Sequence, residues 1–68
     1  MSIRAYAYYV GNVSFNDFRK DIFPVEEDEN YIESKFQRLH NDPTFPLSLD
    51  KNTYKLLVEA VAKRYPNA

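Results

Sequence analysis

The stretch from Tyr31 to Tyr65 constrains the fold most strongly, because its pattern predicts two helices joined by a tight turn. The turn is the run Asn41-Asp42-Pro43-Thr44-Phe45-Pro46, whose two prolines and two turn-forming polar residues exclude one continuous helix. This stretch is about half of a 68-residue chain. The sequence therefore predicts a domain whose core is built from helices.

The helix after the turn is expected to run from Lys51 to Arg64. Its apolar residues recur at spacings of three and four, which places them on one helical face; they are Tyr54, Leu57, Val58, Val61 and Tyr65. Asp50 precedes this pattern and is a suitable N-cap. Pro66 disfavours helical geometry at the residue before it, so the helix is expected to end there.

A shorter helix is predicted before the turn, with Asn30 as its N-cap and Glu33 completing a capping box. Its apolar stripe is narrow and consists of Ile32, Phe36 and Leu39. Within the turn itself, Phe45 is the only large apolar residue. We expect it to anchor the turn in the core; the alternative is an exposed aromatic that docks a partner.

Another short helix is predicted from about Phe15 to Ile22. Ser14 is expected to cap it, and Pro24 follows its end. The apolar residues Phe15, Phe18 and Ile22 would form its buried side.

The N-terminal segment from Ile3 to Val10 has two interpretations. Its tyrosines and valine favour a strand, which Gly11 and Asn12 would turn into a short hairpin. The helical interpretation places Ile3, Tyr6 and Val10 on one stripe, with Gly11 ending the helix. The extended interpretation is preferred, and a third alternative is that the segment becomes ordered only against a partner or a second copy.

Size and composition predict one small domain, residues 1–68, with a tyrosine-rich segment (1–13) and a helical core (14–65). A chain of this length buries only about 60% of its unfolded surface, and no cysteine is present to reinforce it. The net charge of −1 gives no general attraction for nucleic acid. No apolar run approaches the roughly 20 residues of a membrane span, and no secretory signal is apparent, so we expect a cytoplasmic protein.

The sequence contains no recognisable catalytic or metal-binding motif. His40 is the only histidine, and without cysteine it has no partner of the usual kind for a metal ion. The single glycine excludes a glycine-rich phosphate loop. We therefore expect no enzymatic activity, no cofactor and no bound metal.

The acidic run from Glu26 to Glu29 also has two interpretations. It is expected to be a solvated loop whose charges favour the start of the following helix. The alternative is a surface for a basic partner.

Several of these elements together resemble the YozE family, small uncharacterised bacterial proteins with a helical fold similar to the sterile alpha motif (SAM). The matching residues lie between about 14 and 65: Ser14-Phe15 with Phe18, Phe36, Asp42 with Phe45-Pro46 in the turn, and Tyr54. The chain departs from the family pattern at Leu47, where a basic residue is usual, and in its longer tyrosine-rich N-terminus. The resemblance implies a SAM-like fold and no catalytic residue.

These observations predict a mainly α protein: a three-helix, SAM-like bundle with either a short strand or an extra helix at the N-terminus. The expected function is protein–protein interaction. The protein is expected to be a phage or prophage accessory protein that binds a host protein; a homodimer is the other expected association. The predicted binding residues are Arg4, Tyr6, Tyr8 and Tyr9. The alternative function is binding of single-stranded nucleic acid, on whose bases these tyrosines would stack.

Overall fold

The computed structural model describes residues 1–68 and contains four α-helices and one short 3-10 helix. The elements are α1 (Ile3–Asn12), α2 (Phe15–Ile22), α3 (Glu29–Asn41), the 3-10 helix η1 (Phe45–Ser48) and α4 (Lys51–Arg64). No residue belongs to a strand. The protein is thus a small, mainly α bundle, and the extra N-terminal element is a helix.

The preferred extended interpretation of the N-terminal segment is wrong, because this segment forms α1. The Ser2 hydroxyl caps the helix by accepting a hydrogen bond from the backbone N–H of Ala5 at 3.0 Å. The helix then continues through Gly11 to Asn12, which excludes a hairpin turn there. The segment is helical because α1 packs against α4 and α3, and this packing outweighs the strand preference of its tyrosines.

The stripe predicted for a helical N-terminal segment is confirmed only in part, because Tyr6 and Val10 are half-buried against the core but Ile3 is not. The buried residues of α1 are Ala5 and Tyr9, whereas Ile3 is almost fully exposed. Apolar residues occur on several sides of this helix, so their spacing alone does not indicate which side faces the core.

The predicted bounds of α2 and α4 are confirmed. Ser14 caps α2 by accepting a hydrogen bond from the Asp17 N–H at 3.1 Å. Asp50 occupies the N-cap position of α4, although its side chain makes no capping hydrogen bond.

The N-cap of α3 differs from the prediction, because Asp28 takes the place expected for Asn30. The Asp28 carboxylate accepts hydrogen bonds from the backbone N–H groups of Asn30 and Tyr31, at 3.1 and 3.2 Å. A carboxylate at this position also suits the positive end of the helix dipole. The end of the acidic run therefore has a local structural role, as the solvated-loop interpretation expected.

The core consists of nine buried apolar residues contributed by all four helices and η1; they are Ala5, Tyr9, Phe18, Ile22, Ile32, Leu39, Phe45, Leu57 and Val61. No charged side chain is buried among them. Phe45 has no solvent exposure, which confirms that it anchors the turn in the core. The alternative of an exposed, partner-docking Phe45 is wrong.

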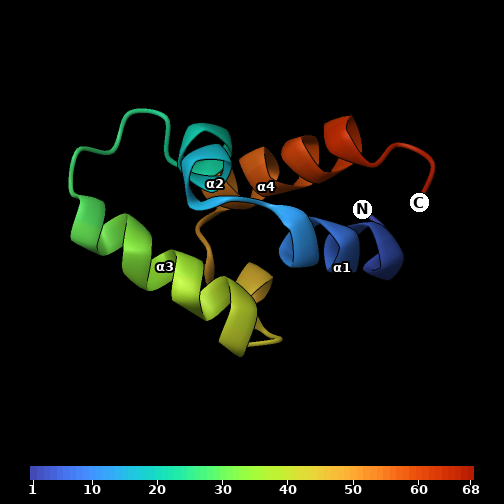
Figure 1. The fold of residues 1–68 in the computed structure, drawn as a ribbon, viewed down its shortest axis with the longest axis horizontal. Helices are drawn as coiled ribbons and strands as arrows, with labels where there is room; N and C mark the ends of the chain where they lie inside the picture. The colour runs from blue at the N-terminus through green and yellow to red at the C-terminus, as the bar shows by residue number, and fades with distance from the viewer.

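Figure 1 shows where the chain ends and the loops lie along the molecule. Both termini are at one end, where the Ser2 hydroxyl donates a hydrogen bond to the Ala68 carbonyl oxygen at 3.1 Å. The loop between α2 and α3 projects at the opposite end of a molecule that measures 33 × 23 × 21 Å. None of the helices combines the length and the apolar character that crossing a bilayer requires.

Candidate interaction surfaces

The four predicted binding residues all lie in α1, but the helix does not present them on one surface. Successive helical residues are rotated by about 100°, so neighbours in the sequence face different ways. Arg4 is exposed, Tyr8 is 47% exposed, Tyr6 is half-buried and Tyr9 has no exposure. The expectation that Tyr9 contacts a partner is wrong, because its ring is part of the core.

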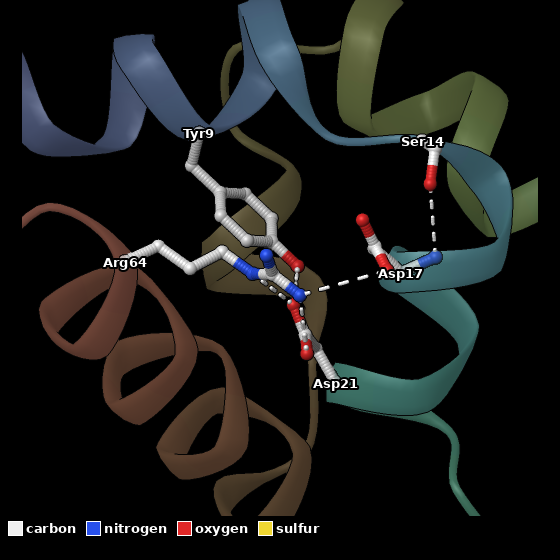
Figure 2. A network of polar contacts seen from close by, with 5 residues as sticks. All are labelled: Tyr9, Ser14, Asp17, Asp21 and Arg64. Atoms are coloured by element: carbon white, nitrogen blue, oxygen red, sulfur yellow. Dashed lines mark hydrogen bonds and ion pairs between the residues drawn. The ribbon is translucent and has the colours of Figure 1, made fainter.

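The hydroxyl of Tyr9 is held in a polar network that joins three helices (Figure 2). It donates a hydrogen bond to Asp21 Oδ2 at 3.0 Å. Arg64 donates to the same carboxylate through Nε at 2.9 Å and through Nη2 at 3.2 Å, and it lies 3.8 Å from Asp17. Because Tyr9, Asp21 and Arg64 come from α1, α2 and α4, this network ties the helices together and is structural rather than a site for a ligand.

We expect the fold to weaken at alkaline pH as Tyr9 ionises. Burial, and then the negative charge of Asp21, raise the pKa of Tyr9 above its ordinary value of 10.0. A raised folded-state pKa means that the stabilisation is complete below the unfolded pKa and is lost as the pH rises above it. Circular dichroism and tyrosinate absorbance, followed together, should show helix loss coupled to late ionisation.

The Tyr9→Phe variant should lose this alkaline sensitivity in part, and Tyr8→Phe should keep it. In both variants Tyr6 should also ionise at a higher pH than an ordinary tyrosine, because burial and the charge of Asp42 raise its pKa. Equal alkaline transitions in wild type and Tyr9→Phe would contradict the role assigned to this hydroxyl.

The exposed part of α1 borders a shallow depression lined by aromatic and cationic side chains. Tyr8 stacks on Tyr65, with ring centroids 5.9 Å apart and planes 25° from parallel. Arg4 and Arg64 line the same depression. Arg64 is already bound to Asp21, so Arg4 is the arginine here without an ion pair.

A second depression is mainly apolar and brings together segments that are far apart in the sequence. It has a volume of about 410 Å³ and is lined chiefly by Met1, Ile3, Tyr6, Pro46, Leu47 and Tyr54. We call it the apolar groove. The three most exposed large apolar side chains of the protein are Val25 (91%), Ile3 (90%) and Leu47 (81%), and two of them line this groove.

Local backbone geometry explains why Leu47 points outward. Phe45 and Leu47 are two residues apart in η1, and a 3-10 helix has about three residues per turn. The two side chains therefore lie on different sides, so burying Phe45 leaves Leu47 exposed. At the opposite wall, Ile3 is the first residue of α1 and lies off the face that carries Ala5 and Tyr9.

The surroundings of the apolar groove carry positive charge. Lys51 and Lys55 are exposed, and they lie three residues before and one residue after Tyr54 on α4. Neither lysine makes an ion pair. The first residues of α1 line the groove, which adds the positive end of one helix dipole. Asp50 at the start of α4 offsets part of this charge.

Tyr6 adds a polar group to this apolar setting. Its hydroxyl is shielded from solvent and has no hydrogen-bond partner in the protein.

The sequence did not identify Ile3 or Leu47 as binding residues. Ile3 belongs to the stripe that the sequence predicts for a helix, and Leu47 stands out only as a departure from the family pattern. One signal for Leu47 is its position between Pro46 and Ser48, outside any apolar periodicity. His40 is accounted for locally, since its Nδ1 donates a hydrogen bond to the Phe36 carbonyl at 2.9 Å. No group of histidine and carboxylate side chains is arranged to hold a metal ion.

Comparisons of the chain with protein-family models, curated proteins and solved structures returned no match. The resemblance to the YozE family, and the SAM-like topology that it implies, therefore stay predictions from the motif residues.

Proposed function

We propose that this protein is a non-enzymatic interaction module that binds a segment of a polypeptide in the apolar groove. The observation that carries the proposal is that Ile3 and Leu47, two of the most exposed apolar side chains, line one depression. Removing apolar surface from water contributes about 25 cal/mol per Å². Covering these two side chains therefore removes apolar surface from water and favours binding.

The character of the groove favours an occupant with an aliphatic side chain and acidic neighbours. The aliphatic group would lie between Ile3 and Leu47, and the carboxylates would lie near Lys51 and Lys55. Such charges mainly accelerate association and select the partner, while the apolar contact supplies most of the affinity. The wider expectation of a phage or prophage accessory protein that binds a host protein stays a prediction.

Capture of binding proteins from a cell lysate tests the proposal through matched surface variants. The chain has no cysteine, so a Gln37→Cys change on exposed α3 allows attachment to a resin away from the groove. Leu47→Asp places a charge in the groove, and Val25→Asp makes the same kind of change at the far end of the molecule. We expect Leu47→Asp to reduce capture of a given polypeptide by roughly tenfold or more and Val25→Asp to preserve it.

Two results would overturn the proposal. One is equal capture by the wild type and by Leu47→Asp. The other is a correctly folded wild type that retains neither a protein from the lysate nor added copies of its own chain. Circular dichroism of each variant ensures that lost capture does not reflect lost structure.

A second candidate function is binding of single-stranded nucleic acid in the depression between Tyr8 and Tyr65. The stacked tyrosines and the unpaired Arg4 favour it, because bases stack on aromatic rings and phosphates bind arginine. It predicts that a labelled oligonucleotide binds, that its affinity falls steeply with salt, and that Arg4→Gln weakens it. Oligonucleotide binding unchanged by Leu47→Asp would favour this second function over the first.

A further inference from the structure

We propose that the segment bound in the apolar groove is the loop between α2 and α3 of a second copy of this chain. This inference rests on the proposed function, because it names the occupant of the same groove. It assigns a role to the acidic run beyond the cap that Asp28 provides for α3.

The loop presents an aliphatic side chain with acidic neighbours, which is the chemistry that the groove favours. Val25 is the most exposed large apolar residue of the protein. It is followed directly by Glu26 and Glu27, neither of which makes an ion pair. By contrast Asp28 caps α3, and Glu29 is paired with Arg19 at 2.6 Å. The Glu26 carboxylate accepts a local hydrogen bond from the Glu27 N–H at 3.1 Å. The loop therefore keeps one apolar group and two carboxylates without a cationic partner.

The base of the loop is held in place before any binding occurs. Phe23 packs edge-on against Phe18, with centroids 5.8 Å apart, and against Tyr31, with centroids 5.7 Å apart. The Glu26 N–H donates a hydrogen bond to the Phe23 carbonyl at 3.2 Å. A loop anchored in this way loses less conformational entropy on binding than a free peptide of the same sequence.

Charge and apolar character match between the two surfaces. Val25 of one copy would contact Ile3 and Leu47 of the next, while Glu26 and Glu27 would lie near Lys51 and Lys55. The loop cannot fill the groove of its own chain, because it projects at the opposite end from the start of α1 (Figure 1). Each copy therefore offers one free loop and one free groove, a head-to-tail contact that continues from copy to copy.

Such a contact is small and should be weak. A loop inserted in a shallow groove buries less than the roughly 1,200 Å² of a standard stable interface. We therefore expect association that grows with protein concentration. Because its charged groups are exposed, we also expect it to weaken as salt is added.

Sedimentation velocity on three proteins and one mixture tests the inference. We expect the average mass of the wild type to rise above the 8.1 kDa of one chain as concentration increases. Val25→Asp, which damages the loop, and Leu47→Asp, which damages the groove, should each remain monomeric. Mixing the two variants leaves one intact loop and one intact groove, so the mixture should form dimers and nothing larger.

The inference is overturned if the wild type stays monomeric at high concentration, if either variant associates as the wild type does, or if the mixture forms no dimer. The double variant Val25→Asp/Leu47→Asp provides a control when it is mixed with the wild type. It has neither an intact loop nor an intact groove, so it should not bind to the wild-type protein. Circular dichroism shows whether each variant keeps its helices.

The failure of this inference is distinguishable from the failure of the proposed function. Capture of another protein that is lost with Leu47→Asp but kept with Val25→Asp, combined with a monomeric wild type, would support the groove and exclude the second copy. Self-association that both single variants abolish, and that their mixture restores as dimers, would establish the second copy as the occupant.

Discussion

Replacing Phe45 with alanine is expected to unfold a large part of the protein at room temperature. Phe45 is fully buried in η1, which joins α3 to α4, and Arg38 lies over its ring at 6.0 Å from the centroid. Truncating a buried phenylalanine typically costs about 3–5 kcal/mol. Domain stability of about 0.05–0.15 kcal/mol per residue gives only about 3 to 10 kcal/mol for a chain of this length. The loss is therefore comparable with the whole free energy of unfolding.

Urea denaturation followed by circular dichroism measures this effect, with Leu47→Ala as the matched control. Leu47 lies two residues further along the same 3-10 helix but is exposed, so its truncation should change the free energy of unfolding by no more than about 0.5 kcal/mol. Equal midpoints for the two variants would show that Phe45 does not anchor the turn.

Replacing Asp21 with alanine should give the second largest loss of stability, of about 2 kcal/mol. The Asp21 side chain is 17% exposed and accepts hydrogen bonds from Tyr9 and Arg64. Removing the carboxylate leaves the Tyr9 hydroxyl unpaired and removes the closer of the two ionic partners of Arg64. The cost comes mainly from the groups left without partners.

Asp17 provides the control for this change. It lies on the same helix and faces the same arginine, but at 3.8 Å and with its side chain 46% exposed. Exposed ion pairs of this kind contribute little, so Asp17→Ala should cost less than about 1 kcal/mol. In a Tyr9→Phe background, Asp21→Ala should be less damaging, because one unpaired group is already absent. If Asp21→Ala lowered the free energy of unfolding by as much in the Tyr9→Phe background as in the wild type, the hydrogen bond between Tyr9 and Asp21 would not contribute to stability.

The sequence predicted α2 and α4 accurately because local chemistry marks both ends of each helix. Ser14 begins α2, and the prolines Pro24 and Pro66 follow α2 and α4. Ser2 marks the start of α1 in the same way, but no comparable signal marks its end, because the helix continues through Gly11. Its secondary structure depends on contacts with α3 and α4, which a local pattern does not contain.

The candidate site was harder to predict than the helices, because exposure is decided by tertiary packing. Tyr9 and Tyr8 are adjacent and identical in type, yet the first belongs to the core and the second lies on the surface. Ile3 has the strongest apolar character in its segment but lies off the packed face. The apolar groove also joins residues from the two halves of the chain, an arrangement that only the folded protein reveals.

The closeness of the two chain ends has a practical consequence for protein engineering. The hydrogen bond between Ser2 and Ala68 brings the termini together, and Met1 and Ser2 also line the apolar groove. An affinity tag or fusion partner attached at the N-terminus would therefore emerge beside the groove and obstruct it. A circular permutant could join the two ends through a short linker and place the new termini in the exposed α3–η1 or α2–α3 loop. It should fold, because the linker has only a short distance to span. In a permutant opened at the α2–α3 loop, Val25 would lie near a free chain end and would no longer be held in position, while every helix would be kept.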